Sequence, residues 1–219
     1  MSLTVAGRTD AGVHAWGQVA SHQGEAAPLG SLNAVLPADI AVLASDPVPE
    51  GFDARHDATS RAYCYRLLAR SGRPALERGH ALHWTHPVDI EALRACAQGL
   101  VGTHDFTAFT PTDTYHVRFD RDVYTASWGE GPGGLLEFWI EADTFMRHMN
   151  RVLVGTMLEV ARGRRTLADF EILLEGRPRA DAGPTVPAHG LYLAGVGYAG
   201  ARVLAAGKPV ATPPPARLA

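Results

Sequence analysis

The side chains best suited to chemistry stand close together near the start of the chain, at residues 6–15, which read Ala-Gly-Arg-Thr-Asp-Ala-Gly-Val-His-Ala. Short apolar runs at residues 3–6 and 19–22 predict a strand on either side of this segment. A carboxylate such as Asp10 can act as a nucleophile or a general base, and the flanking glycines let the loop backbone approach a ligand closely. The alternative is a polar hairpin loop in which Asp10 hydrogen-bonds its own turn. Residue spacing alone leaves both interpretations open.

The segment resembles, almost residue for residue, the active-site loop of the TruA family of tRNA pseudouridine synthases, which reads AGRTDAGVHA or a close relative of it. Other segments that resemble family sequences follow in the family's order: residues 32–40, 52–55, 58–65, 102–109, 145–151 and 187–193. The resemblance extends to about residue 198 and covers most of the chain. It implies an enzyme, an isomerase that acts on RNA.

The resemblance also implies an α+β fold, in which helices flank a mainly antiparallel central sheet and the pseudouridine synthase fold is built from two similar halves. Residues 1–57 would then be the remainder of the N-terminal half, which carries the Asp10 loop, and residues 58–200 the C-terminal half. Residues 201–219 are rich in proline and alanine and are expected to be disordered. The family's substrates are uridines at positions 38–40 of the tRNA anticodon stem-loop, and the family works as a homodimer that clasps tRNA.

Isomerising uridine to pseudouridine requires that the N1–C1′ bond break, that the base turn, and that C5 be joined to C1′. The reaction involves no redox change and no loss of a group, so we expect neither a metal nor a cofactor. One carboxylate is sufficient, and carboxylates are ionised at neutral pH. The resemblance assigns the catalytic role to Asp10. The sequence leaves three first steps open: attack on the sugar carbon, attack on the pyrimidine ring, and abstraction of the 2′ proton of the ribose.

The resemblance gives four other residues a place in substrate binding. Tyr63 matches the family tyrosine that stacks against the flipped base, and such a platform returns about 1–3 kcal/mol toward the cost of unstacking. Core packing is the alternative, and it fits Tyr65 better than Tyr63. Arg8 is expected to contact RNA and help flip the target, and Arg151 to form an ion pair with the catalytic carboxylate. Leu191 is expected to line the pocket floor, although a strand residue could equally belong to the core.

The start of the chain departs from the family pattern. Family members usually have a strand, a turn and a helix ahead of the active-site loop, whereas here the loop follows within a few residues of Met1. A catalytically impaired RNA-binding remnant is therefore the alternative function. A sheet that lacked its first strand would expose an unpaired edge.

Two further departures lie downstream. Residues 113–121 stand where relatives often carry a Ser-rich, Pro-containing segment, so no RNA contact is carried over there. Asn150 replaces the usual Val, which we expect to be a change compatible with the surface. A glycoside hydrolase that uses Asp10 is a weaker hypothesis, because such enzymes mostly need a second carboxylate nearby and the loop offers none.

Composition bounds the kind of partner. The 219 residues carry a net charge of −3 at pH 7 with a pI of about 6.3, which argues against binding of a polyanion through bulk charge. A protein that binds tRNA must then concentrate its positive charge locally. The cationic residues are nearly all arginine, with Lys208 the only lysine, and arginine suits phosphate contact and stacking. No apolar run approaches the roughly 20 residues of a membrane span, and no secretory signal is visible, so we expect a cytoplasmic protein without membrane contact.

Cysteine and histidine spacing gives little sign of a metal site. Cys64 and Cys96 are the only cysteines, form no C-x-x-C pair, and are expected to be buried free thiols. His80, His83 and His86 recur every three residues, but no acidic residue or cysteine completes a set of ligands, so we expect no metal.

Periodicity predicts the elements that position these side chains. Predicted strands cover residues 61–70, 123–128, 135–142 and 191–199, and predicted helices cover residues 33–40, 87–102, 145–162 and 166–176. Alternation indicates that Tyr63, Tyr65 and Leu67 share one face of the first strand. Phe138 and Ile140 mark the buried face of the third strand, which pairs with the second as an antiparallel hairpin.

Capping residues mark the helix ends. Asp89 is the expected N-cap of the second helix, and residues 166–169 resemble a capping box at the start of the fourth. Thr144 is the candidate cap of the third and longest helix. Arg147 and Arg151 would then lie on one side of that helix as an i, i+4 pair.

Overall fold

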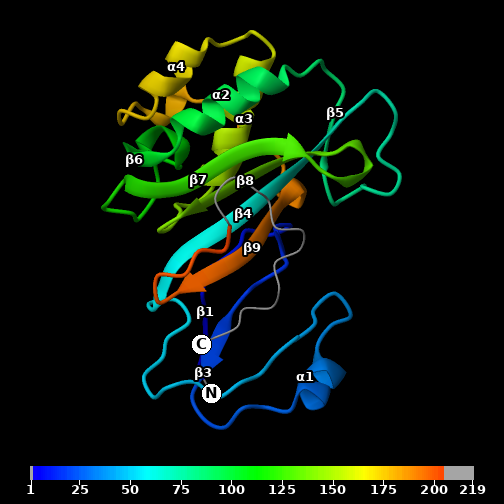
Figure 1. The fold of residues 1–219 in the computed structure, drawn as a ribbon, viewed down its shortest axis with the longest axis vertical. Helices are drawn as coiled ribbons and strands as arrows, with labels where there is room; N and C mark the ends of the chain where they lie inside the picture. The colour runs from blue at the N-terminus through cyan, green and yellow to red at the C-terminus, as the bar shows by residue number, and fades with distance from the viewer. Residues whose placement is uncertain (1, 205–219) are drawn as a thin grey trace.

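Two sheets carry the β-structure of residues 2–204, which is the part of the chain that the structure, a computed structural model, describes. The elements in chain order are β1 (Leu3–Val5), β2 (His14–Ala15), β3 (Ala20–His22), α1 (Leu29–Val35), β4 (Ala58–Ala69), β5 (Leu82–Trp84), α2 (Ile90–Gly99), β6 (Gly102–Asp105), β7 (Asp120–Glu130), β8 (Leu136–Ala142), α3 (Met149–Ala161), α4 (Leu167–Ile172) and β9 (Leu191–Tyr198). The strands β1 and β3 pair as a small antiparallel sheet. In Figure 1 this sheet and α1 lie at one end of the molecule and helices α2, α3 and α4 at the other, with the large sheet between them.

The large sheet has seven strands in the order β2-β9-β4-β8-β7-β6, with β5 paired to β4. The pairs β2–β9 and β4–β5 are parallel, and the other pairs are antiparallel. The sheet is therefore mixed, and the prediction of a mainly antiparallel sheet is wrong. Both parallel pairs involve strands of only two or three residues, which are too short for an alternation pattern to reveal them or their direction.

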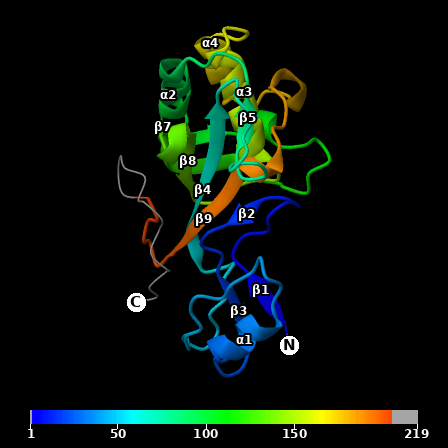
Figure 2. The same ribbon diagram turned by 90° about the vertical axis from the view of Figure 1, so that its right-hand side faces the viewer.

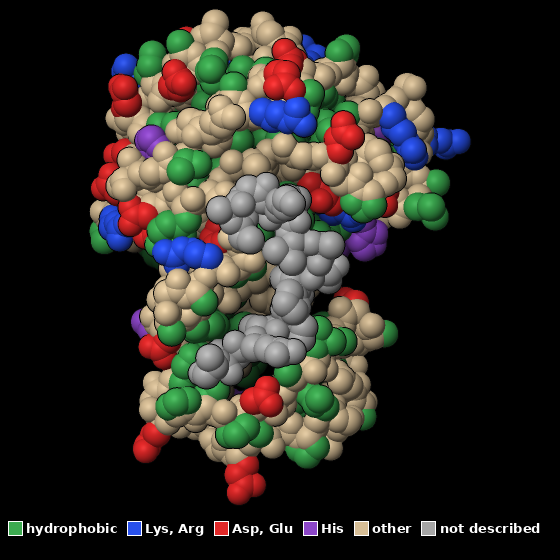
Figure 3. All heavy atoms as spheres, viewed as in Figure 1, with side chains coloured by type: hydrophobic (Ala, Val, Ile, Leu, Met, Phe, Trp, Pro, Cys, Tyr) green, Lys and Arg blue, Asp and Glu red, His purple; other side chains and the backbone are tan. Residues whose placement is uncertain are grey.

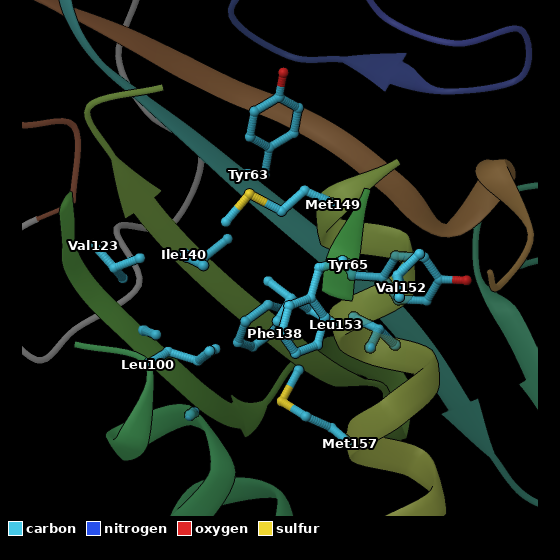
Figure 4. Packing of buried hydrophobic residues seen from close by; sticks show 14 of the residues in the cluster. Tyr63, Tyr65, Leu100, Val123, Phe138, Ile140, Met149, Val152, Leu153 and Met157 are labelled. Carbon is cyan, nitrogen blue, oxygen red and sulfur yellow. The ribbon is translucent and has the colours of Figure 1, made fainter. Parts of the chain in front are cut away.

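Helices α2, α3 and α4 cover one face of the large sheet, where α2 contacts β7 and α3 contacts β4 (Figure 1, Figure 2). Tyr63, Tyr65 and Leu67 of β4 belong to this main core, which confirms the shared face predicted for them. Phe138 and Ile140 of β8 pack in the same core (Figure 4). Burying each such large side chain stabilises the fold by about 1.5–3 kcal/mol relative to leaving it exposed.

The opposite face of β4 and β8 is buried as well, which alternation did not indicate. A smaller core there consists of Ala62, Cys64, Trp139, Tyr192, Ala194 and Leu204. Glu141 is fully buried nearby. Its carboxylate accepts hydrogen bonds from Ser60 Oγ at 2.6 Å and from the backbone N–H groups of Val203 and Leu204 at 2.9 and 2.8 Å, which compensate its burial. The beginning of the predicted tail thus packs against the sheet, and the rest, residues 205–219, lies outside the described residues.

Helix ends follow the predicted caps where the signal is local. At the start of α2, Asp89 Oδ1 accepts two backbone N–H groups at 2.9 and 3.1 Å, and residues 166–169 form the capping box of α4. Helix α1 ends before Pro37, as the proline predicts, but it begins at Leu29, four residues earlier than the predicted start at Asn33. None of its residues is buried, so the sequence has no periodic apolar pattern from which the start of this helix could be predicted.

The start of α3 also differs from the prediction. The helix begins at Met149, and its N-cap is His148, which has the left-handed φ of 64°. Thr144 is therefore not the cap, and Arg147 precedes the helix. Arg147 and Arg151 consequently do not form an i, i+4 pair. The helical spacing of apolar residues extends ahead of Met149 in the sequence, but a left-handed residue cannot continue a right-handed helix.

Candidate active site

A pocket of about 330 Å³ lies where the Asp10 loop meets β4, the segment before α3 and the start of β9. It is lined by Ala6, Gly7, Arg8, Thr9, Asp10, Val13, Arg55, Arg61, Tyr63, Tyr115, His116, Thr144, Phe145, Met146, Arg147, His148, Met149, Asn150, Arg151 and Leu191. Every site residue predicted from the sequence is among them: Asp10, Arg8, Tyr63, Arg151 and Leu191. Asp10 and Arg151, which are 141 positions apart in the sequence, thus meet in one cavity of the size that ligand sites have.

The Asp10 loop runs from β1 to β2, and its shape depends on one glycine. The Val13 N–H donates to the Asp10 carbonyl oxygen at 3.0 Å and closes a tight turn, in which Gly12 has a φ of 84°. Glycine adopts that conformation without steric cost. The Gln18 side chain accepts from the Gly7 N–H at 3.3 Å and donates to the Gly7 carbonyl oxygen at 2.7 Å, which fixes the start of the loop. Since the turn uses the backbone of Asp10, its carboxylate is available to the rest of the pocket.

The Asp10 carboxylate contacts residues at the beginning of α3. Arg151 Nη1 donates to Oδ2 at 2.8 Å, and Nε of the same guanidinium donates to the Val186 carbonyl oxygen, also at 2.8 Å. Nε2 of His148 lies 3.3 Å from the same Oδ2. Asp10 and Arg151 therefore form an ion pair, and the side chain of Asp10 does not cap its own turn. His148 is a neighbour of the carboxylate that sequence reasoning missed.

Tyr63 lines the pocket from β4 but is largely buried, with 8% of its surface exposed. Its ring packs edge-on against Phe145, with 5.0 Å between the ring centroids and an interplanar angle of 80°. Burial raises the pKa of Tyr63 to about 12, with a smaller contribution from the negative charge of Asp10 and in spite of the nearby Arg61, so the phenol is neutral at ordinary pH. Tyr63 serves the core and the pocket at once, and its stacking on a flipped base stays a prediction.

Leu191 and Arg8 lie at different depths of the pocket. Leu191 is buried at the start of β9 and lines the cavity, whereas Leu193 is fully buried in the main core and does not line it. Arg8 is exposed, and it makes no hydrogen bond or ion pair with residues 2–204. Its guanidinium is available to a phosphate.

Positive charge is concentrated at this pocket. The arginines in its lining are Arg8, Arg55, Arg61, Arg147 and Arg151. Asp10 is the one acidic residue in the lining, so five positive charges minus one negative charge give a formal charge of +4. Residues 9–54, by contrast, contain no lysine or arginine, and the small sheet and α1 at the bottom of Figure 3 show acidic but no basic side chains on that face. A protein of net charge −3 thus presents a locally positive site, as a polyanionic ligand requires.

Arg61, which sequence reasoning left without a role, ties the Asp10 loop to the large sheet. Its guanidinium donates hydrogen bonds to four backbone carbonyl oxygens. Nη1 reaches those of Ala58 at 3.0 Å and Asp143 at 3.1 Å. Nη2 reaches those of Ala6 at 3.3 Å and Arg55 at 2.7 Å. The only signal available for Arg61 was its place in a segment that resembles the family.

The segment that departs from the family pattern, residues 113–121, begins at the rim of the pocket. Thr110 Oγ1 donates to the Arg147 carbonyl oxygen at 3.1 Å, and the Arg147 guanidinium forms an ion pair with Asp113. These contacts hold the loop against the segment before α3. Tyr115, which is 71% exposed, thereby presents a ring at the mouth of the pocket, a position that the resemblance did not predict.

Asn150 is not at the surface, which corrects the expectation drawn from the sequence. It lies in the first turn of α3, lines the pocket and is only 4% exposed. Its Oδ1 is buried and has no hydrogen-bond partner among the described residues. An unpaired buried amide of this kind costs about 1–3 kcal/mol.

Histidines and cysteines do not gather into a ligand set in residues 2–204, where no group of three or more His, Cys, Asp or Glu side chains could hold a metal ion. His83 Nε2 instead donates to the Arg70 carbonyl oxygen at 2.9 Å, and the Tyr192 hydroxyl donates to the His80 carbonyl oxygen at 2.7 Å. Both cysteines are free and buried, as predicted. Within the described part of the chain, no helix combines the length and apolar character needed to cross a membrane.

Comparison with known proteins identifies relatives over most of the chain. A family model described as tRNA pseudouridine synthase matches residues 96–199, which include Arg151 and Leu191. The chain is 38% identical over 198 residues to the tRNA pseudouridine synthase A of Bacillus velezensis. The aligned region covers 88% of this chain and 79% of the relative. It is 38% identical over 210 residues to that of Caulobacter vibrioides, covering 90% and 81%. It is 40% identical over 198 residues to that of Chromobacterium violaceum, covering 88% and 75%.

Proposed function

The chain belongs to the tRNA pseudouridine synthase A family, and we propose that it isomerises uridine to pseudouridine in the anticodon stem-loop of tRNA. The observation that carries the proposal is the ion pair between Asp10 and Arg151 inside a pocket whose lining has a formal charge of +4. A carboxylate paired with a guanidinium suits a reaction that needs one nucleophile or base, and the surrounding arginines suit a polyanionic substrate.

The reaction exchanges one bond to the sugar for another. The N1–C1′ bond breaks and the C5–C1′ bond forms, while C5 loses a proton and N1 takes one up. In this proposal Asp10 is the catalytic carboxylate and Arg151 orients it. Tyr63 stacks against the flipped uracil, which returns about 1–3 kcal/mol toward the cost of unstacking. Leu191 packs against the base, and Arg8 contacts the RNA backbone at the rim.

The proposal extends to domains and assembly. Residues 1–57 belong to the N-terminal half of the fold, which carries the Asp10 loop, and residues 58–200 form the C-terminal half; the chain works in the cytoplasm as a homodimer that binds tRNA across both subunits. Family membership supports this assembly. Sedimentation equilibrium at the concentrations used for activity measurements tests it, because an active monomer is incompatible with a tRNA site shared between subunits.

The activity is tested by tritium release from a tRNA transcript labelled at C5 of uridine, since the C5 proton leaves only when the new bond is made. The protein should release tritium, and Asp10→Ala and Asp10→Asn should each lower the rate by roughly 10³-fold or more. Binding of the transcript by Asp10→Asn should not weaken, because the variant removes a negative charge from the pocket. The proposal fails if the unmodified protein releases no tritium, or if Asp10→Ala releases it equally fast.

A protein that binds RNA without modifying it is the competing function, and the same assay separates the two. RNA binding alone predicts salt-sensitive binding with no tritium release. The position of Asp10 favours the enzyme, because a carboxylate among five arginines repels RNA phosphates and would only weaken a pure binding site.

A further inference from the structure

His148 shares the Asp10 carboxylate with Arg151. Its Nε2 lies 3.3 Å from Oδ2, and Arg151 Nη1 lies 2.8 Å from the same oxygen. The other carboxylate oxygen, Oδ1, makes no hydrogen bond or ion pair with residues 2–204. Arg151 donates a hydrogen bond to Oδ2 and His148 Nε2 lies against the same oxygen, which leaves Oδ1 as the oxygen available to a substrate in the pocket.

The backbone of His148 is strained. Its φ of 64° and ψ of −3° lie in the left-handed region, where a Cβ atom crowds the backbone and a residue with a side chain is disfavoured. Among the described residues, only His148 and Ala199 combine a side chain with a positive φ. The strain brings no capping bond, because the His148 side chain makes none at the N-terminus of α3. Strained residues persist where the surrounding structure holds them, and they gather at active sites.

Neighbouring contacts show how this conformation is held. Met146 and Met149, on either side of the strained segment, are buried in the main core. The Met149 N–H donates to the Met146 carbonyl oxygen at 3.2 Å and closes the turn, and the Val152 N–H donates to the His148 carbonyl oxygen at 3.0 Å. The core thus fixes the backbone that carries the His148 ring, and the ring meets Asp10.

The charge state of the ring suits a hydrogen-bond donor. Burial lowers the pKa of His148, and the positive charges of Arg151, Arg147 and Arg179 act in the same direction, whereas Asp10 opposes them. The ring is therefore neutral at neutral pH. A carboxylate oxygen only accepts, so a hydrogen bond to it requires the proton of the neutral ring on Nε2. A neutral donor orients Asp10 without adding a second positive charge that would weaken it as a nucleophile.

We propose that His148 is a positioning residue, which in its neutral Nε2–H form orients Asp10 together with Arg151 so that Oδ1 is the reacting oxygen. The proposal rests on the proposed function for its kinetic readout. In this structure His148 Nε2 contacts Asp10 Oδ2 at 3.3 Å without forming a hydrogen bond, and the proposal is that the bond forms when substrate binds, as catalytic contacts commonly tighten in the complex.

Two glycine variants make a matched test. His148→Gly and Ala199→Gly each relieve a left-handed residue, but only the first removes a contact with Asp10. Neither variant should lower the melting temperature, because glycine has no steric penalty at positive φ. His148→Gly should lower kcat for tritium release about 10- to 100-fold with KM changed less than about threefold, because a misplaced reacting group costs up to 10²-fold. Ala199→Gly should leave both constants unchanged.

Rescue distinguishes positioning from a merely structural role. Asn tolerates the left-handed conformation and can donate a hydrogen bond, so His148→Asn should recover part of the lost kcat, and free imidazole should partly restore His148→Gly. The proposal is contradicted if neither His148→Asn nor free imidazole recovers activity. It is also contradicted if His148→Gly loses kcat only because the variant is less stable, as a lower melting temperature would show. If the kcat of His148→Gly equals that of an active wild-type protein, the positioning role of His148 is wrong and the proposed function stands. If the wild type itself is inactive, the proposed function fails first.

A second measurement needs no turnover. Nitrogen-15 NMR of the imidazole should show the Nε2–H tautomer of His148 at neutral pH, and Asp10→Ala should remove that preference. A wild-type ring in the Nδ1–H tautomer would overturn the proposal whatever the activity.

Discussion

Arg61 offers the most direct test of how the fold holds the Asp10 loop. We expect Arg61→Ala to destabilise the protein and loosen the loop, because the carbonyl oxygens of Ala6, Arg55, Ala58 and Asp143 all lose their donor. These oxygens belong to the end of β1, the start of β4 with the turn before it, and the segment after β8. One guanidinium therefore joins three parts of the chain.

The magnitude follows from the number of bonds. Four bonds at roughly 1 kcal/mol each contribute about 4 kcal/mol, and removing a partly buried guanidinium returns about 1 kcal/mol of its desolvation cost, for a net loss of about 3 kcal/mol. For a protein of this size, 1 kcal/mol shifts the melting temperature by about 2–4 °C, so we expect a fall of about 6–12 °C. Arg61→Lys should lose part of this stability, because a single ammonium nitrogen cannot span the four oxygens.

Thermal unfolding followed by circular dichroism measures the shift, and limited trypsin digestion measures the exposure of the bond after Arg8, which should be cut faster in Arg61→Ala. Arg70→Ala is the matched control. Arg70 directly follows β4 and is exposed, and among the described residues its side chain donates only to the nearby carbonyl oxygens of Gly72 and Arg73. The melting temperature of Arg70→Ala should therefore differ from that of the unmodified protein by no more than about 2 °C. If Arg61→Ala also melts within that range and Arg8 stays protected, the four bonds do not hold the loop.

Three further predictions concern the pocket. Asn150→Val should raise the free energy of unfolding in urea by about 1 kcal/mol, because it removes a buried amide oxygen without a partner, and a decrease would contradict this reading. Burial lowers the pKa of His148 in the folded protein, so the unfolded chain binds a proton at His148 more readily. The free energy of unfolding should therefore fall as the pH drops below about 6.5. Urea titrations of His148→Gly should lack the contribution of His148 to this pH dependence. Binding of tRNA, followed by fluorescence anisotropy, should weaken steeply with salt, and Arg8→Ala should reduce that slope by about 1, whereas an unchanged slope would exclude a phosphate contact of Arg8.

The sequence predicted those features whose cause is local. The cap at Asp89 and the capping box at residues 166–169 involve groups a few positions apart, and each signal could be read from spacing. The shared face of Tyr63, Tyr65 and Leu67 follows from the alternation of β4. The Asp10 loop was visible because its whole signature is contiguous.

Features that depend on distant partners could not be predicted in this way. The apolar spacing continues through Phe145, but α3 starts later because the packed segment around His148 holds a left-handed residue. Glu141 is buried because the backbone at Val203 and Leu204 folds back onto it. The partners of Arg61 are backbone carbonyl oxygens, which leave no pattern in the sequence.

The course of the Asp10 loop has a mechanical consequence. The loop leaves the small sheet at β1 and enters the large sheet at β2, beside β9, so it is a strap between the two (Figure 2). Arg151 and His148 belong to the large-sheet side. A rotation of the small sheet is therefore transmitted to the distance between Asp10 and both partners, and the Arg61 bond to Ala6 resists it.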